Sequence, residues 1–200
     1  MEKINKGVIL LIKTIKKIIS NKKFTEELNK INKNFFNLKQ ELHIKNELIV
    51  QFNSECGNDE IAISEYPRGK YGTSVDLSLI KNNELKNRVE LKYQYPRGLR
   101  CKGVQRELLK DTNTLKGGYY CTDFILIIHK RFFDKKGTYA ISGVEAIYPD
   151  WNDNFSEKHL SEFENGINRS FDRNVISVEA SEPYKNIYHF IFYHFKSSAK

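Results

Sequence analysis

A nearly continuous apolar run, TDFILIIHK at residues 122 to 130, most constrains what this chain can fold into. Apolar and polar residues do not alternate in this run, whereas a strand with one face in water shows that alternation. Residues 122 to 130 are therefore expected to form a strand that is buried on both faces. Such a strand belongs in the interior of a sheet, with other elements packed over it.

Two amphipathic helices are expected at the start of the chain. Residues 7 to 20 place apolar side chains at helical spacing with lysines between them: Val8, Leu11, Ile12, Ile15, Ile18 and Ile19. A second helix is expected to begin near Thr25, a suitable N-cap, and to direct inward the side chains of Leu28, Ile31, Phe35, Leu38 and Leu42. These patterns predict a helical hairpin over residues 1 to 46, packed on or next to an α/β domain of residues 47 to 200.

From about residue 48 the periodicity becomes that of strands. Four runs, ELIVQF, EIAISEY, TSVDLSLI and RVELKYQY, are separated by Gly, Asn and Pro and predict a meander. Residues 101 to 118 predict a helix that ends at two glycines, just before the buried strand. In the last third, SEKHLSEFENGINRSF predicts a helix that opens at Ser156, and TYAISGVEAIY and NIYHFIFYHF predict strands.

Charged side chains fall on one face of two of these strands. If TSVDLSLI and RVELKYQY form an antiparallel hairpin centred near Glu84, residue 76 lies opposite 92 and residue 78 opposite 90. Asp76, Glu90 and Lys92 then share one face of the sheet. For an isolated Glu-x-Lys pair, a solvated strand face is the ordinary explanation. The addition of Asp76 raises the alternative of a site.

Composition limits the classes of function. The formal net charge of +8 favours an acidic partner, with nucleic acid first and an anionic membrane surface second. Three widely spaced cysteines without a CxxC pattern indicate neither a disulfide framework nor a zinc ribbon, which favours a cytoplasmic protein. The apolar run at residues 8 to 12 is too short for a transmembrane segment. Signatures of P-loop, dinucleotide, α/β-hydrolase and zincin enzymes are missing.

An Asp on one strand, Glu-x-Lys on the next, then a helix and a buried strand resembles the PD-(D/E)XK nuclease superfamily over about residues 41 to 130. The segments SEYPRGKYGTSVDLSLI, VELKYQY and LLKDTNTLK…FILIIHK look like the Glu-Tyr-Pro, Asp-Leu, Glu-Leu-Lys and helical Asp segments of its small members. Val75 stands where the name-giving motif has proline. The resemblance implies an α/β fold with a restriction-endonuclease-like core, in which helices flank a central mixed β-sheet.

The resemblance also implies a metal-dependent nuclease, a DNA endonuclease of restriction, defence or repair, with DNA favoured over RNA and a homodimer as the plausible assembly. Asp76 and Glu90 offer the carboxylates that Mg²⁺ prefers, with Mn²⁺ as a substitute. By resemblance, the backbone carbonyl of Leu91 completes the metal site. Lys92 is expected to orient the attacking water or, with a pKa lowered by the cation, to help deprotonate it.

Supporting residues are open to a second explanation, because each is also an ordinary surface side chain. The candidates for additional metal, water or phosphate contacts are Glu65, Glu41, Glu47, Gln94, Gln105 and Asp111. The candidates for nucleic-acid binding are Arg68, Arg97, Arg100 and Lys102. Arg68 and Arg97 belong to two YPRG tetrapeptides, at 66 to 69 and 95 to 98, which predict turns.

Two other functions are compatible with the sequence. The first is a non-catalytic basic DNA-binding module on the same fold. It does not explain why an acidic cluster is kept near phosphates, which carboxylates without a metal would repel. The second is a membrane-surface protein that uses the basic N-terminal helix.

Overall fold

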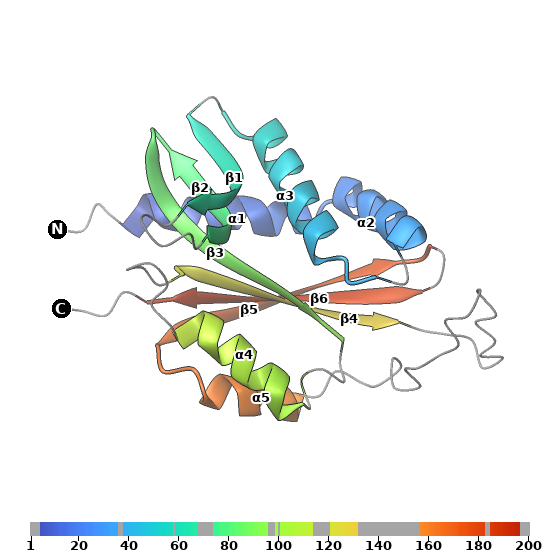
Figure 1. Cartoon of the computed structure of the whole chain (residues 1–200). Coiled ribbons are helices and arrows are strands. Elements are labelled where there is room, and N and C mark those ends of the chain that lie inside the picture. The colour runs from blue at the N-terminus through green and yellow to red at the C-terminus, as the bar shows by residue number, and fades with distance from the viewer. Residues whose placement is uncertain are drawn as a thin grey trace.

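The computed structural model describes residues 5–35, 38–57, 59–67, 74–95, 99, 101–113, 121–131, 157–182 and 185–196. These residues form one six-stranded sheet and five helices, and the helices lie in two layers, one on each face of the sheet (Figure 1). No helix in these ranges is both long enough and apolar enough to cross a membrane.

The sheet is mixed, as expected. Its strands lie in the spatial order β1-β2-β3-β4-β6-β5. Only β3 and β4 run parallel, and every other neighbouring pair is antiparallel. The strands are β1 (Glu60–Pro67), β2 (Ser74–Lys81), β3 (Glu84–Gln94), β4 (Asp123–Arg131), β5 (Phe171–Ala180) and β6 (Asn186–Phe195). The chain crosses from β3 to its parallel neighbour β4 through a helix, as parallel neighbours require.

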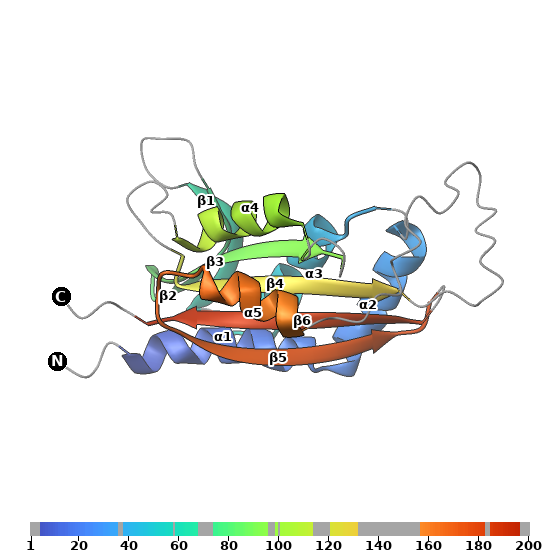
Figure 2. The same ribbon diagram turned by 90° about the horizontal axis from the view of Figure 1, so that it is seen from below.

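The helices divide between the two faces. One face carries α1 (Asn5–Ile19), α2 (Lys22–Phe35) and α3 (Glu41–Glu55). The opposite face carries α4 (Lys102–Asn113) and α5 (Glu157–Asn165), which lie in front of the sheet in Figure 2. The expected boundary between residues 46 and 47 lies inside α3, and a single apolar cluster joins α1, α2 and α3 to the sheet.

Strand β4 is buried on both faces, which confirms the interpretation of its apolar run. Ile125 and Ile127 pack into the cluster under α1, α2 and α3. Phe124, Leu126 and Ile128 pack into the second cluster, under α4 and α5. Successive side chains of a strand point to opposite faces, so an apolar residue at every position serves both layers.

The prediction for residues 38 to 52 was wrong. ELIVQF is helical and belongs to α3, and the second helix ends at Phe35 instead of continuing to Leu42. Ile44, Leu48 and Phe52 are buried at a spacing of four, the period of a helix face, which a six-residue window hides. Leu38 and Leu42 were expected to point inward, yet they are 52% and 56% exposed.

The β2–β3 hairpin forms two residues away from the predicted register. Asn82 and Asn83 both have positive φ, 51° and 60°, so they make a two-residue turn of the type that asparagine tolerates. Leu77 therefore pairs with Val89, and the register implies Glu90, not Lys92, opposite Asp76. A shift of two residues keeps every side chain on its face, so Asp76, Glu90 and Lys92 still share one.

The C-terminal third was predicted only in part. The helix begins near Ser156 as expected but ends at Asn165, and the unpredicted strand β5 follows it. Strand β6 coincides with NIYHFIFYHF. The expected strand TYAISGVEAIY and residues 114 to 118 of the helix expected over residues 101 to 118 lie outside the described residues.

Candidate active site

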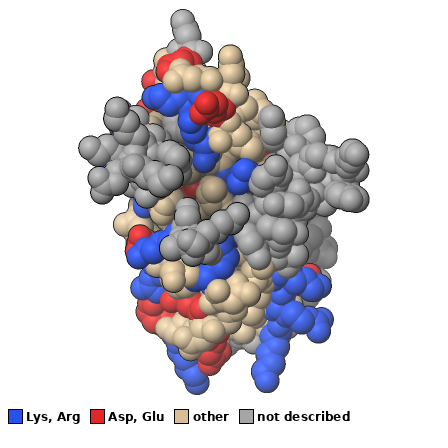
Figure 3. Space-filling view, turned by 90° about the vertical axis from the view of Figure 1, so that its left-hand side faces the viewer, with Lys and Arg blue, Asp and Glu red and all other residues tan. Residues whose placement is uncertain are grey.

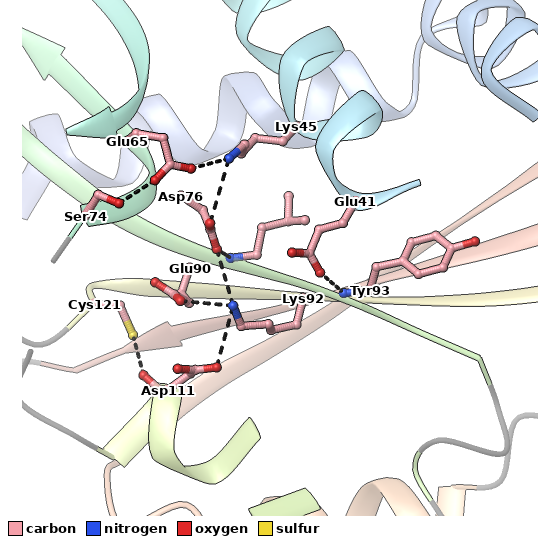
Figure 4. Close-up of polar contacts among 11 residues, drawn as sticks. Glu41, Lys45, Glu65, Ser74, Asp76, Glu90, Lys92, Tyr93, Asp111 and Cys121 are labelled. Atoms are coloured by element: carbon pink, nitrogen blue, oxygen red, sulfur yellow. Dashed lines mark hydrogen bonds and ion pairs between the residues drawn. The ribbon is translucent and has the colours of Figure 1, made fainter. Parts of the chain in front are cut away.

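The candidate site lies where β2 and β3 separate. Their pairing runs from Lys81–Glu84 to Leu77–Val89, while β2 stays paired with β1 as far as Ser74. Beyond this fork two carboxylates replace the missing backbone partners of β3. Asp76 Oδ2 accepts a hydrogen bond from the Leu91 N–H at 2.9 Å, and Glu41 Oε2 accepts one from the Tyr93 N–H at 2.7 Å (Figure 4).

Lys92 lies at the centre of the acidic groups. Its Nζ is 3.1 Å from Glu90 Oε1, 3.6 Å from Asp111 Oδ2 and 3.7 Å from Asp76 Oδ2. These residues come from three elements, because Asp76 is on β2, Glu90 and Lys92 are on β3, and Asp111 is on α4. The fold therefore gathers on one face of the sheet four charged groups that are up to 35 residues apart in the chain.

A second ion pair adjoins the first. Lys45 Nζ, on α3, is 2.5 Å from Glu65 Oε1 and 3.9 Å from Asp76 Oδ1. Glu65 also accepts a hydrogen bond from the Ser74 hydroxyl. Sequence reasoning missed Lys45 because it missed α3. Once α3 is known, Lys45 follows Glu41 by four residues and so lies on the same side of the helix.

Burial makes the site sensitive to charge. Glu90 is 5% exposed, and the side chains of Asp76 and Asp111 are 18% and 17% exposed. Burial, and then repulsion from Glu90, raise the pKa of Asp76 above its usual value. Burial is also the main cause that raises the pKa of Glu41. A further positive charge in the site would therefore lower the pKa of both carboxyl groups and stabilise their ionised forms.

Lys92 remains an ammonium in this arrangement. Burial by itself lowers the pKa of Lys92, but the carboxylates of Glu90, Asp76 and Asp111 together raise it above the ordinary value. The pKa lowering expected from the sequence requires a nearby cation, which reverses the balance of charges. Without that cation, the Lys92 ammonium offsets part of the negative charge of the cluster.

The supporting candidates divide into two groups. Glu41, Glu65 and Asp111 lie with the central residues. Glu47 is six residues beyond Glu41, on another side of α3, where it accepts a hydrogen bond from Gln51 at 2.8 Å.

Gln94 shares the strand face of Glu90 and Lys92 and is half-buried. Gln105 donates to the Leu99 carbonyl at 2.6 Å and so holds the segment that leads into α4. Among the basic candidates, Lys102 is exposed at the start of α4. Arg68, Arg97, Arg100 and the two YPRG turns lie outside the described residues, at least in part.

The donor set suits a hard divalent cation. Carboxylate oxygens of Asp76 and Glu90 are the ligands that Mg²⁺ prefers. The N–H and C=O of one strand residue point to the same side, so the Leu91 carbonyl opens toward the fork beside the N–H that Asp76 accepts. Within the described ranges no group of three or more Asp, Glu, His and Cys side chains is already arranged around a common cation position. The Lys92 ammonium lies among those carboxylates instead.

Comparison with protein-family models, curated proteins and solved structures found no match to this chain. The sequence and the geometry of this site therefore carry the functional interpretation by themselves.

Proposed function

We propose that this protein is a divalent-metal-dependent nuclease that hydrolyses phosphodiester bonds, a DNA endonuclease of the kind used in restriction, defence or repair. One observation carries the proposal: carboxylate oxygens of Asp76 and Glu90 both lie within 3.7 Å of the Lys92 ammonium, at the point where two strands separate. Asp76 lies on β2, Glu90 and Lys92 lie on β3, and α4 and the parallel strand β4, buried on both faces, come next in the chain. The resemblance to PD-(D/E)XK nucleases rests on this order of elements.

The carboxylates at the fork support a cation at this site. Among the described residues, the contacts at the fork bring together the carboxylates of Asp76, Glu90, Asp111, Glu41 and Glu65 with the ammonium groups of Lys45 and Lys92. A gathering of carboxylate oxygens of this kind suits a divalent cation. Burial, and then repulsion from Glu90, raise the pKa of Asp76, and a bound cation would oppose that rise.

Each residue has a distinct role in the proposed reaction. Asp76 and Glu90 would hold Mg²⁺, or Mn²⁺ in its place, with the Leu91 carbonyl as a further oxygen ligand. Such an ion would supply positive charge against the phosphate and make a water easier to deprotonate. Lys92 donates hydrogen bonds that orient the attacking water. The water oxygen bonds to phosphorus as the bond from phosphorus to the leaving oxygen breaks, and the proton lost by the water is balanced by one that the leaving oxygen takes up from solvent.

The net charge supports nucleic acid as the partner. A charge of +8 attracts a polyanion, and in DNA each phosphate that is neutralised releases counterions. On the face shown in Figure 3, blue and red side chains lie side by side, so the charge there is mixed rather than uniformly basic. A homodimer, which would present two sites to two strands, is part of the proposal.

A non-catalytic DNA-binding module is the second candidate. One observation favours it: the Lys92 ammonium already lies within 3.7 Å of the carboxylates of Asp76, Glu90 and Asp111, in the place where a metal would be expected. In that case the site is a structural ion-pair network that fastens β2, β3 and α4 together.

Cleavage assays distinguish the two candidates. Supercoiled plasmid and a single-stranded oligonucleotide are incubated with Mg²⁺ or Mn²⁺, with EDTA as the metal-free control. Glu90→Gln and Lys92→Ala test the site. Glu84→Gln and Lys86→Ala are matched controls, because that pair lies on the same strand but at the far end of the hairpin.

The nuclease proposal expects cutting by the wild type and by both control variants, and none by Glu90→Gln or Lys92→Ala while these still fold and bind DNA. Equal DNA binding by all five proteins, with no cutting in either metal, contradicts the proposal and leaves the binding module as the better interpretation.

A further inference from the structure

The ion pair between Lys45 and Glu65 is the most unusual feature beside the proposed catalytic residues. The Lys45 side chain is only 7% exposed, and lysine is rarely buried unless it is paired. Its partner Glu65 is 55% exposed, so the ion pair does not serve to bury the glutamate. The position of the buried Lys45 ammonium is therefore better explained by its effect on the carboxylates beside it, those of Glu65 and Asp76.

Glu65 is held in a strained backbone conformation. Its φ of 52° lies in the left-handed region, which a non-glycine residue keeps only where the surrounding structure fixes it. The Lys45 ammonium holds one oxygen of its carboxylate, and the Ser74 hydroxyl donates to the other. Both contacts point the Glu65 carboxylate toward the fork between β2 and β3 (Figure 4).

Asp76 is contacted from two sides. The Leu91 N–H donates to Oδ2 at 2.9 Å, and the Lys45 ammonium faces Oδ1 at 3.9 Å. The direction of the carboxylate is thus fixed by one group on β3 and one on α3. Lys92, at 3.7 Å from Oδ2, contacts the same oxygen as Leu91 and does not replace Lys45.

We propose that Lys45 is a positioning residue: anchored by Glu65, its ammonium holds the Asp76 carboxylate in the orientation in which it accepts the Leu91 N–H and presents itself to the metal. The inference deepens the proposed function and rests on it for the part that concerns the metal. The orientation of Asp76 is a property of the metal-free protein and is tested there.

The Leu91 amide reports that orientation directly. In proton–nitrogen NMR spectra of the metal-free full chain, Asp76→Ala shows where the Leu91 signal moves when its acceptor is removed. Lys45→Met keeps the length and apolar stem of lysine, and it is expected to move the Leu91 signal in the same direction. Lys45→Arg restores the charge and is expected to return the signal toward the wild-type position.

Two further variants make the NMR result decisive. Glu65→Gln changes an exposed side chain, so it folds even if Lys45→Met does not, and it is expected to move the Leu91 signal less but in the same direction. Lys86→Met removes a lysine at the far end of the hairpin and is expected to leave the signal in place. An unchanged Leu91 signal in folded Lys45→Met or in Glu65→Gln overturns the positioning role.

Calorimetric titration with Mn²⁺ links the inference to the proposed metal. Removal of a neighbouring positive charge by itself strengthens cation binding, whereas loss of an outer-shell contact to a metal ligand weakens it roughly 10- to 100-fold. We expect Lys45→Met to bind Mn²⁺ at least about tenfold more weakly than Lys86→Met. Equal or tighter binding contradicts positioning of the metal ligand. If the wild type binds no Mn²⁺, the proposed function fails, and the Leu91 signal still decides the role of Lys45.

Discussion

The buried carboxylate of Asp123 gives a prediction that does not depend on function. Asp123 is 2% exposed at the start of β4 and is contacted by donors from three strands or their ends. His194 Nδ1 lies 2.7 Å from Oδ1, Asn87 Nδ2 donates to Oδ2 at 2.7 Å, and the Thr122 hydroxyl donates to Oδ2 at 2.8 Å. Asp123→Asn keeps the shape but removes the charge and replaces an acceptor with a donor.

The expected cost is about 3 kcal/mol of unfolding free energy. A hydrogen bond to a charged group contributes about 1.5–3 kcal/mol, and removing one partner of a buried pair costs up to about 5 kcal/mol. With a urea dependence of about 2 kcal/mol per molar, the midpoint of unfolding falls by about 1.5 M. Asp172→Asn is the matched control, because this neighbouring carboxylate pairs with Lys196 at the surface and is expected to cost less than about 1 kcal/mol.

The cost is expected to depend on pH through His194. The hydrogen bond to Asp123 raises the pKa of His194, burial opposes this, Asp172 adds to the rise, and Lys16 of α1 opposes it. A histidine whose pKa is higher in the folded state stabilises the folded protein. This stabilisation is complete below the pKa of an unfolded histidine, about 6.5, and is lost as the pH rises through the pKa in the folded state. Urea unfolding should therefore show a larger cost of Asp123→Asn at pH 5.5 than at pH 8.5. Equal costs at both pH values refute the charged pair.

Three shorter predictions concern the metal, the turn and the core. Mn²⁺ at about ten times its dissociation constant should stabilise the wild type by about 1.4 kcal/mol in a thermal unfolding assay, and an equal rise in Asp76→Ala would show that the ion binds elsewhere. Asn83→Gly should preserve or raise the urea midpoint because φ is 60° there, whereas Asn83→Val should lower it by at least about 1 kcal/mol of stability; the reverse order would contradict the turn. Leu48→Ala should cost about 2–5 kcal/mol in the same assay, and Val50→Ala, on the exposed side of α3, less than about 1 kcal/mol.

The sequence predicts an element well where one force decides its pattern. In β4, burial on both faces leaves an uninterrupted apolar run that no solvent-exposed strand would show. In β5, an edge strand, only Val178 and Ala180 are buried, so the apolar signal is too sparse to mark a strand. Residues 47 to 52 satisfied a strand pattern and a helix pattern equally, and packing of Leu48 and Phe52 against the sheet decided for the helix.

The sequence likewise predicted one part of the candidate site and missed another. Alternation along β2 and β3 placed Asp76, Glu90 and Lys92 on one face, and that placement survived an error in the register because the error was even. The contacts of Lys45 with Glu65 and Asp76 depend on the position of α3 and on the left-handed backbone of Glu65. Neither property has a local sequence pattern, so they required the three-dimensional structure.

The fork between β2 and β3 divides the proposed ligands between two parts of the sheet. Asp76 belongs to the ribbon of β1 and β2, which joins the rest of the sheet through the short pairing between residues 77–81 and 84–89. Glu90 and Lys92 belong to the central strands, which are fixed by β4. Any group that binds Asp76 and Glu90 together therefore joins the ribbon to the body of the sheet, so binding at the site is expected to oppose separation of these two parts.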